Sequence, residues 1–177
     1  NSIFTAAALA GAGLGFLPHN FPRARAFMGD VGSTTLGFGL AMLTLVGGTR
    51  PMDEHLPWIA FVLPLGVFIY DATFTLIKRI LRRENFLKPH REHHYQLLIR
   101  CGWSHTRVTL LQGALMVLWC TGALLYALGD QMGAGRGEWL QAGVLAGLLG
   151  IMGVYSVLVH RYFARHRTDA AACPSPA

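Results

Sequence analysis

The sequence predicts an all-α fold, a polytopic integral membrane bundle of about five transmembrane helices. Of the 177 residues, 53% are hydrophobic and only 14% are charged, whereas soluble domains have about 25% charged residues. The apolar residues also gather into five stretches, each close to the ~20 residues that cross a bilayer. The formal charge of +6 does not indicate nucleic acid, because no basic stripe interleaved with aromatic residues occurs.

The five predicted spans are residues 3–17, 34–48, 56–77, 108–128 and 139–159. The first two are short and rich in glycine, so their ends are the least defined. Small residues in these stretches allow helices to pack closely in lipid. A transporter would show the same small residues, so they do not discriminate between functions.

Lysine and arginine set the expected orientation. Residues 18–33, 78–107 and 161–177 hold 13 of the 15 basic residues, and the alternate connections hold only Arg50 and Arg136. The positive-inside rule therefore predicts that these three segments are cytoplasmic. The start of the chain would then lie outside and its end inside.

The chain begins without Met and enters a span almost at once, so we expect a C-terminal piece of a longer protein. Residues 1–167 are expected to form the C-terminal half of a polytopic domain, with cytoplasmic loops at residues 18–33 and 78–107. Residues 168–177 are predicted to be a disordered tail. The three cysteines have no metal-ligand spacing, and we expect free thiols.

The polar loop between the first two spans contains the most informative residue. Residues 20–33 read NFPRARAFMGDVGS, with Asp30 between Gly29 and Gly32. Glycines let the backbone turn sharply so that N–H groups approach an anion, and a carboxylate offers the hard oxygen ligands that Mg²⁺ prefers. The loop is therefore suited to hold a metal ion and a phosphate. The alternative is a glycine turn with a solvated aspartate.

A longer pattern surrounds this aspartate, at Asn20, Pro22, Ala24, Phe27, Met28, Gly29, Asp30, Gly32 and Ser33. It closely resembles the NxPAxxFMGDxGS signature of the polyprenyl-phosphate N-acetylhexosaminyl-1-phosphate transferases (glycosyltransferase family 4). These membrane enzymes load a sugar-phosphate onto undecaprenyl phosphate. One position departs from the signature, because the family usually has Pro-Ala where this chain has Arg23-Ala24.

The third span carries an ionisable side chain, Asp71. At 1.5 Å per residue it would lie ~22 Å beyond Leu56, roughly 8 Å short of the inner boundary of a ~30 Å core. A charge at that depth is costly, which favours a functional role; the alternative is a structural pair with Lys78 or Arg79. The segment resembles the PLxDxxxxxxRR context of a family aspartate, with a looser match in the spacing from Pro64.

The second cytoplasmic loop reads KPHREHHYQ at residues 88–96. Imidazole N–H groups and the guanidinium of Arg91 suit an anionic diphosphate. Zinc is a competing ligand, although His90, His93 and His94 could hold it only in a strained local arrangement. A basic loop that binds anionic lipid headgroups is the structural alternative.

This loop resembles the HRxHxYQ motif of the family, filled by His90, Arg91, His93, Tyr95 and Gln96. The form is more similar to enzymes that start O-antigen or similar envelope glycans than to the HHHFE form of the peptidoglycan-precursor transferase. The resemblance covers residues 15–110 and fades across the last two spans. The aspartate-rich motif of the family, usually DD, is absent because no adjacent aspartates occur, so we expect this piece to be inactive alone.

The resemblance implies Mg²⁺-dependent transfer of a sugar-1-phosphate from a UDP-N-acetylhexosamine to undecaprenyl phosphate, with release of UMP. Mn²⁺ is the alternative ion, and the site would face the cytoplasm at the bacterial inner membrane. The implied catalytic residues are Asp30, His93 and Asp71, with Asp30 also the metal ligand. The implied substrate-binding residues are Asn20, Gly29, Ser33, His90, Arg91, Tyr95 and Gln96. The missing N-terminal half and membrane lipid are the other expected partners.

The competing class is a membrane transporter fragment in which Asp71 and the histidine loop gate an ion or anionic solute. A structural membrane subunit would leave the FMGDVGS and HREHHYQ strings unexplained. The sequence determines neither the UDP-sugar nor the glycan pathway. It is also silent on oligomeric state, and a homodimer is left open.

Overall fold

The computed structural model describes residues 2–22, 24–26, 28–48, 57–83, 92–133 and 135–170. Every regular element in these ranges is helical, which confirms the predicted all-α class. The elements are α1 (Ser2–Asn20), α2 (Gly29–Gly48), α3 (Trp58–Val62), the 3₁₀ helix η1 (Leu63–Leu65), α4 (Gly66–Leu81), α5 (His94–Arg100), α6 (His105–Gln131) and α7 (Arg136–Ala170).

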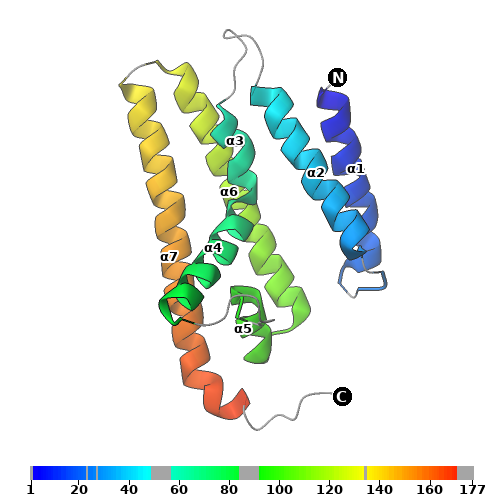
Figure 1. The fold of residues 1–177 in the computed structure, drawn as a ribbon, viewed down its shortest axis with the longest axis vertical. Helices are drawn as coiled ribbons and strands as arrows, with labels where there is room; N and C mark the ends of the chain where they lie inside the picture. Colours follow the sequence, from blue (N-terminus) through cyan, green and yellow to red (C-terminus); the bar gives the residue numbers. More distant parts are fainter. Residues whose placement is uncertain are drawn as a thin grey trace.

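The long helices run roughly along one direction, and the short helix α5 lies at one end (Figure 1). Helices α6 and α7 pack side by side, and α1 and α2 form a hairpin that meets the remainder through α3. The α1–α2 connection, α5 and the end of α7 all lie at the same end. These are the segments that the charge distribution assigned to one side of a membrane.

Among the residues that the structure describes, four helices are long and apolar enough to cross a membrane, judged by length and composition. They cover Gly29–Val46, Trp58–Leu81, His105–Gln131 and Arg136–His166. The remaining predicted span, residues 3–17, is helical within α1 but is not among these four. Helix α1 has 19 residues, close to the minimum length for a crossing.

The third span is bent, because α3 passes through η1 into α4. Pro64 lies in the first turn of η1, where its ring and its missing N–H prevent a continuous helix. Gly66 then lies against Trp119, at a position where an added Cβ would clash with the indole ring. Figure 1 shows α4 leaving the direction of α3. The depth predicted for Asp71 assumed a straight helix, whereas η1 interrupts the helix between α3 and α4, so this depth stays a prediction.

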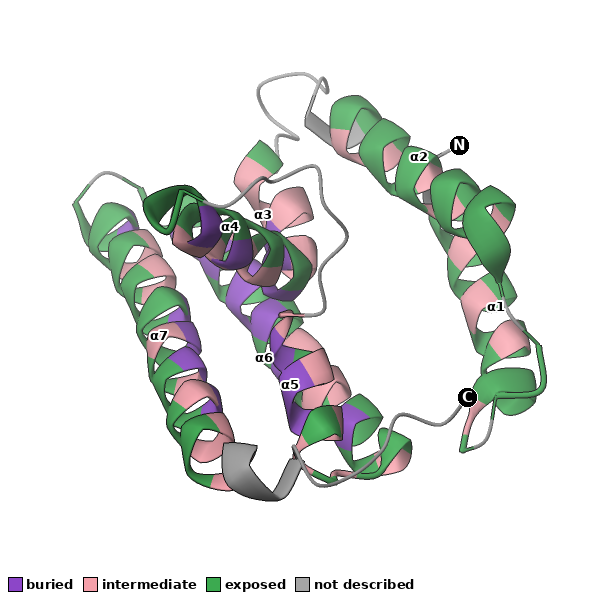
Figure 2. Cartoon of the chain, turned by 60° about the horizontal axis from the view of Figure 1, so that its bottom comes forward, coloured by how far each residue is buried: buried purple, intermediate pink, exposed green. Residues whose placement is uncertain are grey.

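The core lies between α4, α5, α6 and α7, where Figure 2 shows the buried faces. One cluster centres on Met152, which is 0% exposed, together with Val67 and Trp119. A second cluster, which includes Leu97, Val108 and Val159, fixes α5 against α6 and α7. Large apolar side chains elsewhere face outward, as lipid-facing surfaces require.

Three predicted boundaries differ from the structure. Helix α2 begins at Gly29, so Asp30 lies in a first helical turn and not in a loop. The expected loop at residues 78–107 contains the end of α4, all of α5 and the start of α6. Helix α7 continues to Ala170, three residues into the segment predicted to be a disordered tail, and residues 171–177 lie outside the described residues.

Candidate functional site

Asp71 of α4 is the centre of a polar cluster that joins α4 to the start of α5. One carboxylate oxygen, Oδ2, lies 3.1 Å from Nδ1 of His93. The other, Oδ1, accepts the backbone N–H of His94 at 3.1 Å and also contacts Nδ1 of His94. The side chain of Asp71 is only 17% exposed. The structure thus brings together Asp71 and His93, two of the three predicted catalytic residues.

The same contacts explain why α5 starts where it does. The first N–H groups of a helix have no intrahelical acceptor and need an external one. Asp71 satisfies the N–H of His94, and Oε1 of Gln96 accepts the N–H of His93 at 3.3 Å. The carboxylate of Asp71 also lies at the positive end of the helix dipole. Gln96, predicted to bind substrate, therefore also caps the helix.

The buried side chain of His94 lies among aromatic rings. It is 1% exposed, and its ring centroid is 5.2 to 5.4 Å from those of Phe74, Tyr155 and His160. Because Nδ1 faces the carboxylate of Asp71, Nδ1 carries the hydrogen. Nε2 is buried without a hydrogen-bond partner among the described residues. His94 is therefore held rigidly, and its ring cannot reach solvent.

His93 is more accessible, with 27% of its side chain exposed. Because its Nδ1 donates to Asp71, Nε2 is the ring nitrogen without a hydrogen in the neutral imidazole. The ring stacks on Tyr95, with centroids 6.0 Å apart and planes inclined by 12°. The hydroxyl of Tyr95 accepts from Nε2 of Gln96 at 3.2 Å. Three residues of the HRxHxYQ string thus share one local network.

Glu92 fastens the segment before α5 to α4 a second time. Its Oε2 is 3.3 Å from Nζ of Lys78 and 3.5 Å from Nη1 of Arg82. Lys78 and Arg82 follow Asp71 by seven and eleven positions, close to two and three helical turns. The three residues therefore share one face of α4 and its C-cap. Burial raises the pKa of Glu92, but the hydrogen bond and charge of Lys78 and the charge of Arg82 outweigh it and lower the pKa overall.

We expect Glu92→Gln to remove an acid-sensitive contribution to stability. Because the pKa of Glu92 is lowered from 4.5 in the folded state, its ion pairs stabilise the fold above the unfolded-state pKa. That contribution is lost as the pH falls through the lowered value. Thermal unfolding of the full-length protein in detergent should show a steeper decrease of Tm below about pH 4.5 for wild type than for the variant. The control Glu138→Gln, at the start of α7, should keep the wild-type slope; equal slopes for all three proteins would contradict the prediction.

Asp30 lies in the first turn of α2, with its side chain exposed. Gly29 begins the helix with a φ of 66°, a conformation that favours glycine. Ser33 Oγ donates to the backbone carbonyl of Asp30 at 3.2 Å. No hydrogen bond or ion pair joins the carboxylate of Asp30 to any residue that the structure describes. Its oxygens are thus available to a cation or to water.

Asn20, the last residue of α1, lines a cleft of about 600 Å³. The opposite wall is the first turns of α6, with His105, Thr106 and Thr109. Phe21, Pro22 and Ala24 complete the lining. The described start of the α1–α2 connection therefore faces α6, and no α4 residue lines this cleft.

The predicted site residues fall into two separate groups. Asp71, His93, Tyr95 and Gln96 lie together, whereas Asn20, Gly29, Asp30 and Ser33 lie on the α1–α2 hairpin. His90 and Arg91 lie outside the described residues. Within the described ranges, no group of three or more His, Cys, Asp or Glu side chains is placed to hold a metal ion.

Sequence reasoning missed three features of this region, namely the contacts of His94 with Asp71, the Lys78–Glu92 pair and the position of His160. His94 was considered as one of the histidines that could bind a diphosphate or zinc, yet its backbone N–H and its ring both contact Asp71. The pairing of Lys78 with Glu92 had a signal, since Glu92 is the single acid in the KPHREHHYQ string. His160, whose ring lies beside His94, had only the signal of an ionisable side chain at the end of an apolar span.

Comparison with known proteins identifies the class. Residues 1–48 match the family model described as glycosyl transferase family 4. The chain is 38% identical over 101 residues to the probable undecaprenyl-phosphate N-acetylglucosaminyl 1-phosphate transferase of Bacillus subtilis, which covers 55% of the chain and 27% of that relative. It is 34% identical over 127 residues to the phospho-N-acetylmuramoyl-pentapeptide-transferase of Desulforudis audaxviator, covering 69% of the chain and 33% of the relative.

A third relative is the decaprenyl-phosphate N-acetylglucosaminephosphotransferase of Mycolicibacterium smegmatis. It is 38% identical over 113 residues, which make up 58% of the chain and 28% of the relative. The chain thus spans about a third or less of the length of these curated relatives. No solved structure matches the chain.

The fold and these matches define a multi-pass membrane protein with bacterial relatives. More particularly, the chain belongs to glycosyl transferase family 4, and the relatives that it matches carry the names of polyprenyl-phosphate sugar-1-phosphate transferases.

Proposed function

We propose that the full-length protein that carries this chain transfers an N-acetylhexosamine-1-phosphate from a UDP-sugar to undecaprenyl phosphate and releases UMP. The observation that carries the proposal is the attachment of His93 to Asp71. It brings the aspartate of the third span together with the part of the histidine motif that the structure describes. That place lies at the same end as the start of α2 (Figure 1).

Phosphoryl transfer depends mainly on positioning and on neutralising charge. Asp71 would fix the imidazole of His93 so that Nε2 faces the diphosphate of the UDP-sugar. Preorganised donors of this kind stabilise charge that develops in the transition state. Arg91 and His90 are proposed to contact the same diphosphate.

Asp30 fits a magnesium ligand, because its carboxylate is exposed and has no partner among the described residues. When bound, Mg²⁺ or Mn²⁺ would neutralise phosphate charge. One carboxylate is too few for a complete site, so further ligands would come from substrate and from the remainder of the protein. Gly29, Ser33 and Asn20 would bind substrate beside Asp30.

The proposed glycan pathway is inferred from the form of the histidine motif. The HRxHxYQ form, present as His90, Arg91, His93, Tyr95 and Gln96, favours the start of O-antigen or other cell-envelope glycan synthesis. A cytoplasmic site at the bacterial inner membrane suits the substrates, because the UDP-sugar is soluble in water while the polyprenyl chain requires lipid.

The direct test is an assay of the full-length protein in neutral detergent with Mg²⁺, undecaprenyl phosphate and a radiolabelled UDP-N-acetylhexosamine. We expect a labelled lipid diphosphate sugar and an equal amount of UMP. UDP-N-acetylglucosamine and UDP-N-acetylgalactosamine should be compared, since the sugar is open. Absence of product with every UDP-sugar, together with solute uptake by the protein in vesicles, would favour the transporter alternative.

The proposed orientation has its own test. Single cysteines at Asp53 and Gly133 should react with a membrane-impermeant maleimide added outside intact cells, whereas cysteines at His93 and Ser175 should react only after permeabilisation. The 13-to-2 distribution of basic residues predicts this result. External labelling at His93 would overturn the proposed topology.

A further inference from the structure

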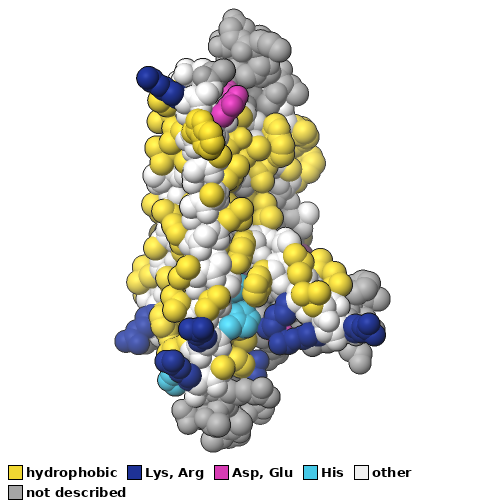
Figure 3. Space-filling model, turned by 90° about the vertical axis from the view of Figure 1, so that its left-hand side faces the viewer, with side chains coloured by type: hydrophobic (Ala, Val, Ile, Leu, Met, Phe, Trp, Pro, Cys, Tyr) yellow, Lys and Arg dark blue, Asp and Glu magenta, His cyan; other side chains and the backbone are white. Residues whose placement is uncertain are grey.

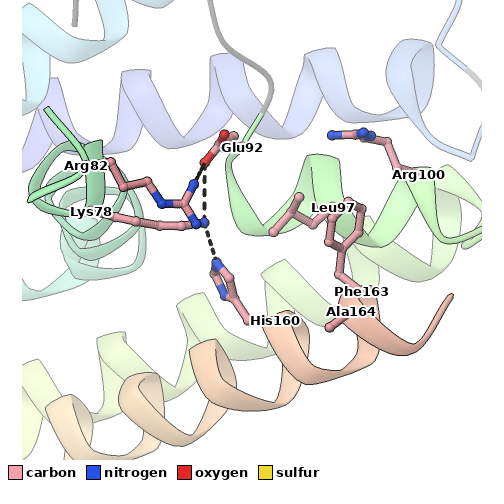
Figure 4. Close-up of a pocket in the computed structure, with 8 residues that line it drawn as sticks. All are labelled: Lys78, Arg82, Glu92, Leu97, Arg100, His160, Phe163 and Ala164. Carbon is pink, nitrogen blue, oxygen red and sulfur yellow. Dashed lines mark hydrogen bonds and ion pairs between the residues drawn. The ribbon is translucent and has the colours of Figure 1, made fainter. Parts of the chain in front are cut away.

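A second polar cavity lies beside the Asp71 cluster, and the proposed reaction does not use it. It has a volume of about 500 Å³ and opens between the end of α4, helix α5 and the last third of α7 (Figure 4). Its lining consists of Lys78, Arg82, Glu92, Leu97, Arg100, His160, Phe163 and Ala164. We refer to it as the α4/α5/α7 cavity.

Three cations and one carboxylate line this cavity. Lys78 and Arg82 approach Glu92 from α4, and Arg100 lies on the other side on α5 (Figure 4). With His160 neutral, the formal charge of the lining is positive. An anion of one or two charges would balance it.

The hydrogen bonds of His160 leave part of Lys78 available. Nδ1 of His160 lies 2.9 Å from the carbonyl of Ser156, so Nδ1 donates and Nε2 is the acceptor. Nζ of Lys78 donates to that Nε2 at 3.0 Å and pairs with Glu92 at 3.3 Å. An ammonium group has three hydrogens, and the third is directed by neither contact.

Arg100 is held in place without an ion pair to any described residue. Its guanidinium carbon lies 5.0 Å from the centroid of the Phe163 ring, within the range of a cation–π contact. Such a contact gives the N–H groups of the guanidinium no oxygen acceptor, so they are left for a ligand. Those N–H groups match the oxygens of a phosphate in a bidentate arrangement.

The cavity also borders apolar surface. Leu97, Phe163 and Ala164 form its floor, and the nearby end of α4 exposes Ile80 and Leu81. In Figure 3 Lys and Arg side chains gather at the lower edge of the broad apolar band, and another lies at its upper end. A ligand could therefore place a charged group in the cavity while an apolar part remains on this band.

We propose that the α4/α5/α7 cavity is a phosphate-binding site, occupied by the headgroup phosphate of an anionic membrane lipid or by a soluble phosphate. Lys78 and Arg100 bind the phosphate oxygens from opposite walls, and Arg82 contributes charge at the mouth. The site is separate from the diphosphate contacts proposed for His93. The proposal rests on the cationic side chains and the volume of the cavity and on its place beside apolar surface. It therefore does not depend on the proposed transferase activity.

The lipid arm of the test uses the full-length protein in phosphatidylcholine nanodiscs with or without phosphatidylglycerol. Native mass spectrometry after release would count retained phosphatidylglycerol. Arg100→Gln should weaken retention about tenfold, as expected for losing a charge-assisted contact. Arg82→Gln changes a half-exposed side chain and should weaken retention less. This variant replaces Arg100→Gln in the test if Arg100→Gln does not fold. The control Arg107→Gln, an exposed arginine in the first turn of α6, should behave as wild type.

The soluble arm titrates inorganic phosphate into the same proteins in neutral detergent, followed by calorimetry. Phosphate binding that Arg100→Gln weakens, without selective lipid retention, supports a soluble ligand. Lipid retention that Arg100→Gln weakens, without phosphate binding, supports a lipid headgroup. If Arg100→Gln and Arg82→Gln match wild type in both arms, the cavity is not a phosphate site.

Discussion

Replacement of Asp71 with asparagine should lower kcat of the full-length transferase by on the order of 10²-fold or more. Asparagine keeps the size of the side chain and can still accept the backbone N–H of His94. It loses the charge that faces Nδ1 of His93, and its amide can present a donor there. His93 would then turn or change tautomer, so that Nε2 no longer contacts the diphosphate as required.

A steady-state assay of Asp71→Asn can separate this positioning role from a general loss of structure. Asp130→Asn is the matched control, because Asp130 is an exposed aspartate at the opposite end of the fold. If Asp71 acts through His93, the double variant Asp71→Asn with His93→Ala should be no slower than His93→Ala alone. Multiplying losses would instead show that Asp71 contacts the substrate independently, and a wild-type rate would show that the cluster is structural only.

Asp71, an ionisable residue within an apolar span, is the part of the candidate site that the sequence indicates most directly. Burying a charge is costly in lipid, so Asp71 in the third span indicated a site before any contact was known. The identity of its partners could not be derived in the same way. Lys78 and Arg79 were the nearest cations along the chain, yet Lys78 pairs with Glu92, and Asp71 pairs with histidines more than twenty residues away.

Helix phase and packing decided the remaining contacts. His160 contacts Lys78 although the two residues are 82 positions apart in sequence. The reason is that α7 packs beside α5 and α6 with the face that carries His160 turned inward. Apolar pattern alone does not determine this rotation, since lipid-facing and buried sides of such helices are equally hydrophobic. The bend at η1 is a similar case: Pro64 was visible, but its effect on the direction of α4 depends on Trp119 packing against Gly66.

The polar GDVGS string was interpreted as a loop, although it forms the first turn of α2. Glycine and aspartate are common in turns, but an aspartate is also stabilising near a helix N-terminus, where it interacts with the positive end of the dipole. Because Asp30 lies in a helical turn and not in a loop, it can also have a structural role at the start of α2. Its carboxylate has an ordinary structural contribution that must be separated from metal binding.

We expect Asp30→Asn to reduce transfer by on the order of 10³-fold, because a carboxylate that binds Mg²⁺ contributes several kcal/mol to stabilising phosphate charge. The structural role predicts a much smaller effect. Loss of a surface charge at a helix N-terminus costs only about 0.3–1 kcal/mol of stability. The two roles therefore differ in both size and kind.

The measurement combines kcat at increasing Mg²⁺ with the Tm of the same samples. Asp30→Asn should stay nearly as stable and as well expressed as wild type, and excess Mg²⁺ should not restore its rate. Thr35→Ala is the matched control, since it removes only a hydrogen bond from its hydroxyl to the carbonyl of Val31 near the start of the same helix and should lose far less activity. A near-wild-type rate for Asp30→Asn, with a decrease in Tm like that of Thr35→Ala, would make Asp30 a helix-end residue and remove it from the proposed metal site.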